Sequence, residues 1–377
     1  GSDGSCIAIP DAPSLREYLD HPAKLLEASA VFAAARCVCG ACSACARRIR
    51  GLDMKFMRFI SAGLGAAALA LSAQAAGGAK HPHAPEGGWD FQGPLGELDM
   101  DSVQRGYQVY REVCASCHSM RLLHYRNLGE PGGPFYDPEY PNANDNPLVK
   151  AFAAQDEILS TEPNDVGDYD YRPARTSDPF KSPYPNEQAA RAANGGAYPP
   201  DLSVITKARA GGASYIYSLM TGYPEEAAIT THTIESVGED GETVTEQQTL
   251  IEVAEMSVFE HGDSHYEGEL VQPVGQYYNP YFAGDTSAQW QGDPRHAPPG
   301  GFLAMPPQLT PGRVEYLDGT EATVSQMAED VAAFLQWAGE PKQTQRKSTG
   351  LAAMIYLAIL AVLLWFSFHR IWRKVDH

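Results

Sequence analysis

Residues 114–118 read Cys114-Ala-Ser-Cys117-His118, and they carry the most specific chemical signal in the chain. Two cysteines at this spacing could form a disulfide or a redox pair. A histidine directly after the second cysteine instead indicates covalent attachment of a c-type haem. The two thiols would add to the haem vinyl groups, and the short turn would bring the His118 ring beneath the iron as an axial ligand. We expect one covalently attached haem c.

A helix is predicted to lead into this motif. Asp99 or Asp101 can cap its start, and apolar residues then recur at helical spacing: Val103, Tyr107, Tyr110 and Val113. A second helix is predicted from the capping box Thr323–Gln326 until Gly339 and Pro341 end it. Its apolar face contains Met327, Val331, Phe334, Leu335 and Ala338. Small c-type cytochromes use such a pair of helices, one before the haem motif and one near the end of the soluble part.

The sixth ligand of a c-type haem iron usually comes from far along the chain, most often from Met or His. Met305 lies in a loop, Ala304-Met305-Pro-Pro-Gln308, where two prolines exclude a helix, so the loop can hold the thioether over the haem. Met220, on a predicted helix, and Met256, in an acidic insertion, remain alternatives. The other methionines considered lie too close to the motif, on the second helix or in an apolar C-terminal segment: Met100, Met120, Met327 and Met354.

Residues 54–75 have the pattern of a secretory signal peptide. A basic start at Lys55 and Arg58 precedes an apolar stretch and the cleavage signal Ala73-Gln-Ala75. Residues 1–53 precede it and are interpreted as a non-native or discarded extension. They hold five of the seven cysteines, four of them in residues 37–45, a spacing that could also ligate zinc or an iron–sulfur cluster.

The C-terminal segment is predicted to be a single transmembrane anchor. Residues 350–368 are nineteen residues without a charge, about 28 Å long as a helix, which is enough to cross the hydrocarbon core of a bilayer. Basic residues flank the segment on both sides, so they do not set its orientation. The signal peptide does, which places residues 76–345 outside the cytoplasm. The anchor and a short cytoplasmic tail then occupy residues 346–377.

The composition narrows the class of protein further. The formal net charge is −19, from 28 Lys+Arg and 47 Asp+Glu, and 44% of the residues are hydrophobic. So much apolar material excludes a disordered acidic tail and a collagen-like fibre. The excess of acidic over basic residues argues against binding to nucleic acid, because the phosphates would be repelled.

An acidic insertion covers about residues 225–269. Between Arg209 and Arg295 there is no Lys or Arg but fifteen Asp or Glu. Such a surface could steer a basic soluble cytochrome c toward the haem, or it could be an ordinary solvated insertion. His261 and His265 could ligate a metal, although loop composition explains them as well. Four apolar residues favour a hairpin here: Val244, Leu250, Ile251 and Val253.

Four segments, in this order, give the chain a specific resemblance to a known family. They are residues 110–120, which include the haem motif; residues 189–202, Ala-Ala-Arg191-Ala-Ala-Asn-Gly-Gly-Ala-Tyr-Pro-Pro-Asp-Leu; Tyr278-Asn-Pro-Tyr-Phe282; and Ala304-Met305-Pro-Pro. Residues 85–377 thereby resemble cytochrome c1, the haem subunit of the quinol–cytochrome c oxidoreductase complex. One departure is Gln308, where a third Pro is common in the family.

The resemblance implies the roles of five residues. Cys114 and Cys117 would be the covalent links to the haem, and His118 and Met305 the axial ligands. Arg191 would pair with a haem propionate, which is reasonable because a guanidinium matches a carboxylate.

The resemblance also implies a fold and a function. We expect a mainly α, loop-rich c-type cytochrome domain with one C-terminal transmembrane helix, in the periplasm and anchored in a bacterial inner membrane. It would accept single electrons from a Rieske-type iron–sulfur subunit and pass them to soluble cytochrome c, beside cytochrome b in a dimeric complex. The isolated chain would be an electron relay, and the enzyme would be the complex. A free-standing anchored cytochrome that feeds a terminal oxidase or reductase, and a haem enzyme with an open sixth position, are the alternatives.

Overall fold

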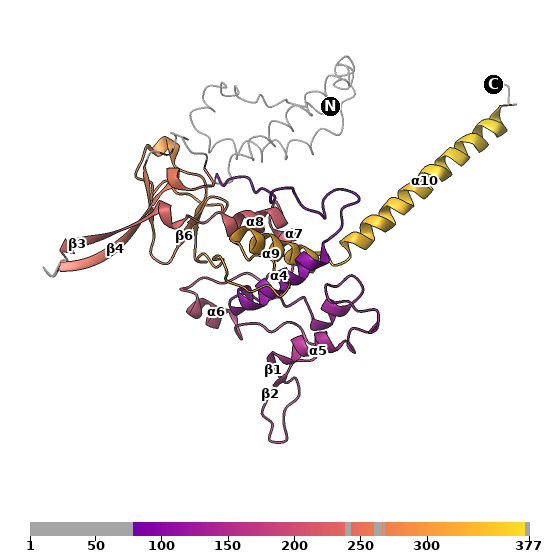
Figure 1. Cartoon of the computed structure of the whole chain (residues 1–377), viewed down its shortest axis with the longest axis horizontal. Helices are drawn as coiled ribbons and strands as arrows, with labels where there is room; N and C mark the ends of the chain where they lie inside the picture. Colours follow the sequence, from indigo (N-terminus) through magenta and orange to yellow (C-terminus); the bar gives the residue numbers. More distant parts are fainter. Residues whose placement is uncertain (1–77, 238–242, 260–265, 267, 374–377) are drawn as a thin grey trace, which may run out of the picture. The chain divides into compact units, whose positions relative to one another are not determined.

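The computed structural model describes residues 78–237, 243–259, 266 and 268–373 (Figure 1), which all belong to one compact unit that begins at Ala76. The predicted extension 1–53, the signal peptide 54–75 and the end of the tail at His377 lie outside these residues. So do His261 and His265.

Two helices, α4 (Met100–Glu112) and α9 (Val324–Gly339), cross at the centre of the unit (Figure 1). Both predicted N-caps are present, because Asp99 accepts hydrogen bonds from the Asp101 and Ser102 amides, and Thr323 accepts one from the Gln326 amide. The backbones approach closely where α4 has Gly106: a Cβ there would lie 1.9 Å from the carbonyl oxygen of Asp330. The two predicted helices are confirmed.

A buried ion pair joins the same two helices. The Asp330 side chain is completely buried and accepts hydrogen bonds from Arg105 Nη2 at 3.0 Å and from Ser102 Oγ at 2.8 Å. These two bonds and one from Gln326 go to Oδ1, and Arg105 Nε donates to Oδ2 at 3.0 Å, so each oxygen of the buried carboxylate has a donor.

Apart from the C-terminal helix, the remaining helices of the described unit are short, and long loops connect them. The α-helices are α5 (Pro147–Ala154), α6 (Glu187–Ala193), α7 (Ile205–Ala208) and α8 (Ala213–Thr221). The 3-10 helices are η3 (Cys114–Ser116), η4 (Tyr125–Gly129), η5 (Glu226–Ala228), η6 (Val253–Glu255) and η8 (Pro294–His296).

The strands form three small antiparallel sheets. β1 (Glu157–Leu159) pairs with β2 (Tyr171–Pro173), and β6 (Tyr277–Asn279) pairs with β7 (Gly301–Leu303). In the acidic insertion, β3 (Ile229–Val237), β4 (Thr243–Glu252) and β5 (Glu269–Gln272) form a sheet in that order. The β3–β4 pairing runs from Ile229–Ile251 to Val237–Thr243, so the predicted hairpin is confirmed.

The buried side chains form two separate hydrophobic clusters. The larger surrounds α4 and α9 and includes a group of aromatic rings around Tyr107 and Phe334. The smaller belongs to the insertion and the segment that follows it: Ala228, Ile251, Val253, Met256, Phe259, Leu270, Tyr278 and Trp290. The insertion therefore has a core of its own.

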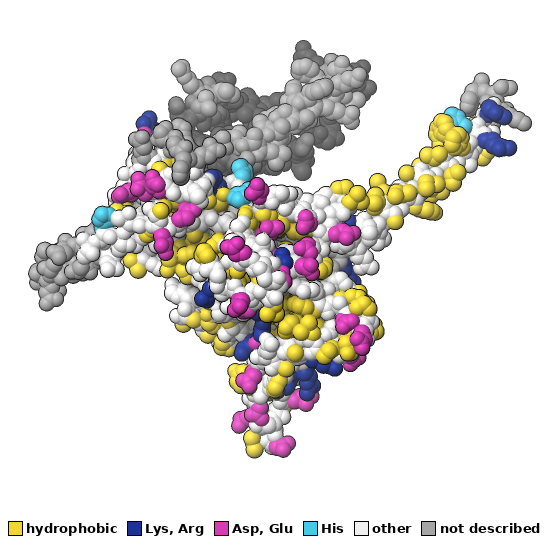
Figure 2. All heavy atoms as spheres, viewed as in Figure 1, with side chains coloured by type: hydrophobic (Ala, Val, Ile, Leu, Met, Phe, Trp, Pro, Cys, Tyr) yellow, Lys and Arg dark blue, Asp and Glu magenta, His cyan; other side chains and the backbone are white. Residues whose placement is uncertain are grey.

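Helix α10 (Gln343–Trp372) contains the predicted anchor. Its apolar window has a mean hydropathy of 2.4, and none of that window is buried. Figure 2 shows hydrophobic side chains along the helix and Lys or Arg at its C-terminal end. It is the one helix among the described residues that is long and apolar enough to span a membrane, and the mainly α, loop-rich fold with one such helix is confirmed.

Candidate haem site

The attachment motif lies at the C-terminal end of α4. The Val113 amide closes the helix on the Val109 carbonyl, and the chain then tightens into η3. Within this turn the amides of Cys117 and His118 both donate to the Cys114 carbonyl, at 3.2 and 2.9 Å. The turn thus holds two thiols and an imidazole within five residues, as covalent attachment of a haem requires.

Both motif cysteines are free thiols, and both are partly buried. Burial raises the pKa of Cys114 to about 12, and the nearby Cys117 adds to this effect. Cys114 is therefore a neutral thiol at pH 7, and it packs against the main hydrophobic cluster. A neutral, partly buried thiol at the edge of an apolar core suits a thioether link to an apolar vinyl group better than it suits thiol–disulfide exchange, which needs a thiolate.

His118 is oriented by a carbonyl group from a distant segment. Its Nδ1 lies 2.9 Å from the Pro200 carbonyl oxygen, which can only accept a hydrogen bond, so the proton is assigned to Nδ1. Desolvation lowers the pKa of His118 against the opposing effects of Pro200 and Asp201, so the ring is neutral at pH 7. The Nε2 lone pair then remains for a metal, which is the arrangement that metal-binding histidines use.

The predicted sixth ligand, Met305, follows β7 in a loop. Its carbonyl oxygen accepts a hydrogen bond from the Tyr223 hydroxyl at 2.9 Å, and this bond ties the loop to the end of α8. Met305 is partly buried and belongs to neither hydrophobic cluster, whereas Met256 is fully buried in the cluster of the insertion and Met220 packs against the main cluster. This environment favours Met305 over both alternatives, and its ligation of iron stays a prediction.

Arg191 makes its contacts within its own segment. The guanidinium pairs with Glu187 at 2.8 Å one turn earlier on α6, donates to the Gly196 carbonyl at 2.9 Å and lies over the Tyr198 ring. Its side chain is 49% exposed. A propionate would have to share this guanidinium with Glu187, so the predicted contact of Arg191 also stays a prediction.

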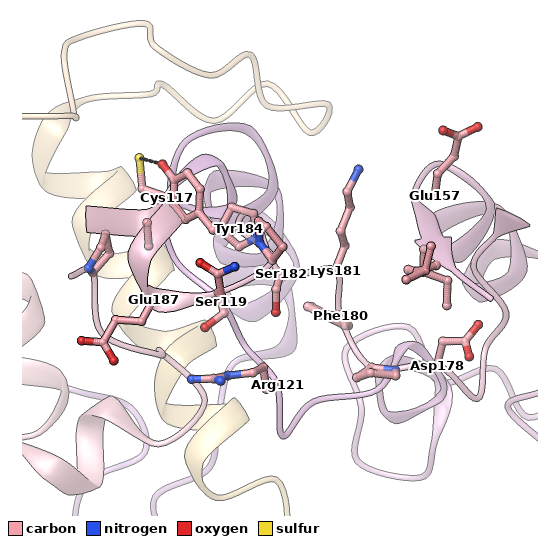
Figure 3. Close-up of a pocket in the computed structure, with 18 of the residues that line it drawn as sticks. Cys117, Ser119, Arg121, Glu157, Asp178, Phe180, Lys181, Ser182, Tyr184 and Glu187 are labelled. Atoms are coloured by element: carbon pink, nitrogen blue, oxygen red, sulfur yellow. Dashed lines mark hydrogen bonds between the residues drawn. The ribbon is translucent and has the colours of Figure 1, made fainter. Parts of the chain in front are cut away.

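A cavity of about 720 Å³ lies on one side of the motif (Figure 3). Cys117 contributes to its lining, and the Tyr184 hydroxyl lies 4.0 Å from the Cys117 sulfur. The rest of the lining comes mainly from residues 178–187 and from β1. The cavity therefore borders the attachment motif, and its lining contains neither of the predicted axial ligands, His118 and Met305.

Two functional contacts were not predicted from the sequence. Pro200, which orients His118, and Tyr223, which holds the Met305 loop, each act on a residue 82 positions away. In the sequence, Pro199-Pro200-Asp201 belongs to a segment that carries the family resemblance, but it gives no local sign of a contact with His118. Taken together, two thiols, a neutral imidazole with an anchored Nδ1 and an apolar core behind them fit a covalently bound c-type haem.

Comparison with known proteins agrees with this geometry. The model of the Cytochrome C1 family matches residues 89–375. Cytochrome c1, heme protein, mitochondrial, from Kluyveromyces lactis is 40% identical over 306 residues, which are 80% of this chain and 82% of that protein. Cytochrome c1 from Rhodospirillum rubrum is 38% identical over 289 residues, 77% of this chain and 87% of that protein.

A longer relative shares the same region. Cytochrome b/c1 from Bradyrhizobium diazoefficiens is 40% identical over 291 residues, 76% of this chain but only 35% of that protein. The chain thus spans about a third of the length of this relative and most of the length of the other two. With the family matched over most of the sequence, and with the haem motif placed at the end of α4, the chain belongs to the cytochrome c1 family, whose members carry a covalently bound c-type haem.

Proposed function

We propose that the chain is the haem subunit of a quinol–cytochrome c oxidoreductase and relays single electrons from a Rieske-type iron–sulfur subunit to a soluble cytochrome c. The observation that carries the proposal is the hydrogen bond from His118 Nδ1 to the Pro200 carbonyl, beside the two free thiols of the motif. One motif among the described residues supports one haem.

The residues of the chain would hold the group and set its properties. Cys114 and Cys117 would attach it, and His118 and Met305 would hold its iron, so no coordination position would remain for a substrate. When bound, the haem supplies a one-electron iron couple, and Met/His ligation favours a high potential. Arg191 would contact a propionate at the solvent side. The chain therefore transfers electrons and performs no bond chemistry itself.

Charge supports a basic electron acceptor. The insertion carries many Asp and Glu and no Lys or Arg, and Figure 2 shows acidic side chains over its visible face. A field of this sign speeds the encounter with a positively charged protein at low salt. The names of the relatives, which include "Cytochrome b/c1", support a place beside cytochrome b in a complex that we propose to be dimeric.

Location follows from the two ends of the chain. The apolar helix α10 supports a single membrane span. The signal-peptide pattern of residues 54–75 supports a bacterial inner membrane, with residues 76–345 in the periplasm and the C-terminal tail in the cytoplasm.

The test is purification of the C-terminally tagged chain from membranes of a host that can attach haem. After gentle solubilisation, the haem spectrum and the co-purifying subunits are recorded together. We expect covalent haem c that arrives with b-type haem and an iron–sulfur protein. The double variant Cys114→Ser/Cys117→Ser is the control: it should stay in the membrane fraction and carry no covalent haem.

Each other outcome contradicts a defined part of the proposal. Covalent haem that arrives alone, under conditions that keep such complexes intact, would favour the free-standing anchored cytochrome. Carbon monoxide binding to the reduced native protein would favour a haem enzyme with an open sixth position and remove Met305 as ligand. Absence of covalent haem from a competent host would overturn the haem assignment.

A further inference from the structure

Asp201 lies directly after Pro200, whose carbonyl orients His118. The carboxylate of Asp201 accepts several hydrogen bonds from neighbouring segments. Its Oδ2 accepts from the Ser119 hydroxyl at 2.8 Å and from the Arg121 amide at 2.9 Å, and its Oδ1 accepts from the Ser203 amide at 2.9 Å. A longer bond from Arg121 Nε to Oδ2, at 3.4 Å, is the fourth, so donors from two segments of the chain meet at one carboxylate.

These bonds join the segment that follows the haem motif to the segment that carries Pro200. We call residues 118–122 and 200–203, with the bonds between them, the ligand seam. Two further bonds cross the seam: the Leu202 amide donates to the Ser119 carbonyl at 2.8 Å, and the Leu122 amide donates to the Ser203 hydroxyl at 3.1 Å. Asp201 accepts the seam bonds from Ser119 and Arg121 and a further bond from Ser203 in its own segment.

Asp201 is held in place by its hydrogen bonds more than by its ion pair with Arg121. Its partner in the ion pair, Arg121, is 59% exposed and lies 3.4 Å away, so water screens this attraction. The Asp201 side chain itself is 23% exposed. Burial raises the pKa of its carboxyl, but the bonds from Arg121, Ser203 and Ser119 outweigh burial and hold the pKa below its ordinary value, so the carboxylate is present at pH 7 as the acceptor.

The seam acts on His118 through one carbonyl group. The bond from His118 Nδ1 to the Pro200 oxygen holds the imidazole in one orientation. A hydrogen bond at this nitrogen also increases the basicity of the ligating Nε2. Both effects depend on the position of the Pro200 carbonyl, and the next residue, Asp201, fixes that position relative to residues 119 and 121.

We propose that Asp201 is a positioning residue for the proximal ligand: through the ligand seam it holds the Pro200 carbonyl against His118 and thereby sets the ligand field and the potential of the haem iron. This inference rests on the proposed haem ligation. Asp201 itself would not contact the iron. Its substitution should change the environment of His118, whereas loss of a surface ion pair alone should not.

The test compares four variants of the haem-loaded protein in its membrane complex. Asp201→Asn removes the charge but keeps the shape, Asp201→Glu keeps the charge but displaces the carboxylate, and Ser119→Ala removes one bond and leaves Asp201 unchanged. Asp178→Asn is the matched control, because Asp178 also pairs with an arginine, Arg172 at 2.8 Å, and accepts a backbone amide, but it lies outside the seam.

Two readouts report on the iron and not on turnover: the g values of the oxidised low-spin haem by electron paramagnetic resonance, and the midpoint potential by redox titration. We expect all three seam variants to shift the g values and to raise the potential, because a weaker bond at Nδ1 makes the ligand less basic and stabilises the oxidised iron less. Asp178→Asn should leave both unchanged.

The outcomes separate this inference from the proposed function. Shifts in Asp201→Asn alone would show that only the charge matters and would overturn the positioning role, as would equal shifts in Asp178→Asn. If Asp201→Asn fails to load haem, Ser119→Ala and Asp201→Glu decide by themselves, and wild-type values in both overturn the inference. A wild-type protein without covalent low-spin haem would instead overturn the proposed function.

Discussion

At the scale of single residues, both candidate axial ligands are held through backbone carbonyl groups. His118 donates from Nδ1 to the Pro200 carbonyl, and the Met305 carbonyl accepts from the Tyr223 hydroxyl, each at 2.9 Å. The histidine is fixed through its ring, but the methionine is fixed only through its backbone. The methionine loop is therefore the more easily displaced of the two.

Tyr223→Phe tests this difference. The ring stays in its buried site, but the bond to the Met305 carbonyl is lost, which costs about 1 kcal/mol. We expect a larger fraction of reduced protein to bind carbon monoxide, because the loop leaves the iron more often. Tyr217→Phe loses a comparable bond, to Ser325 at 2.8 Å between α8 and α9, and should leave carbon monoxide binding at the wild-type level. Equal binding by both variants would contradict the prediction.

At the scale of elements, the crossing of α4 and α9 supports the attachment motif. Gly106 allows the backbones to touch, and Asp330 fills the adjacent space with its buried bonds to Ser102 and Arg105. The motif begins two residues after α4 ends, so a change in the crossing is expected to move the thiols.

Gly106→Ala is expected to destabilise this crossing. The added Cβ would meet the Asp330 carbonyl at 1.9 Å and the Phe334 Cβ at 2.7 Å, so the helices must separate. Overpacking of this kind costs about 1–3 kcal/mol. Thermal unfolding of the haem-loaded protein should show a lower midpoint and a lower yield of covalent haem. In Gly350→Ala, where nothing lies within 4 Å, the midpoint should stay unchanged.

At the scale of the whole molecule, charge and apolar surface are segregated along the chain. The acidic residues between 225 and 269 lie on an insertion with its own hydrophobic cluster, and the exposed apolar side chains of α10 lie at the C-terminal end. The first feature predicts an effect of salt on electron transfer, and the second predicts attachment to a membrane.

Neutralising acidic residues of the insertion between positions 235 and 246 tests the first feature. Five acidic residues are replaced by Gln or Asn: Glu235, Glu239, Asp240, Glu242 and Glu246. Reduction of a basic cytochrome c should become slower by up to about tenfold at low ionic strength, and the difference should vanish near 1 M salt, where charges are screened beyond about 3 Å. Oxidation by an uncharged small-molecule acceptor should not change. An equal rate at low salt would assign the insertion no part in steering.

Truncation after Ser348 tests the second feature. This chain keeps Lys347, whose side chain donates to the carbonyls of Phe91 and Gly96, but loses the apolar part of α10. We expect a haem-containing domain in the soluble fraction, whereas the full chain sediments with membranes. A variant in which residues 350–368 are all leucine should remain in the membrane, and a truncated chain that still sediments would refute the prediction.

The elements predicted from the sequence were those with local signals. The caps Asp99 and Thr323 and the apolar spacing after them predicted α4 and α9, and the apolar pattern around Ile251 predicted a hairpin. The third strand of that sheet, β5, was not predicted, because four residues carry too little periodicity. The Arg105–Asp330 pair was not predicted either, because nothing in the sequence relates two charges 225 residues apart.

The sequence by itself therefore determined the attachment motif, the two central helices and the apolar anchor, since each depends on residues within a few turns of one another. Only the tertiary structure decided how His118 is oriented, which methionines are committed to a hydrophobic cluster, and that the insertion has a core of its own. The orientation of His118 depends on its contact with Pro200, 82 positions away, and the core of the insertion joins residues as far apart as Ala228 and Trp290. Such pairs meet only after the chain has folded, so no local pattern encodes them.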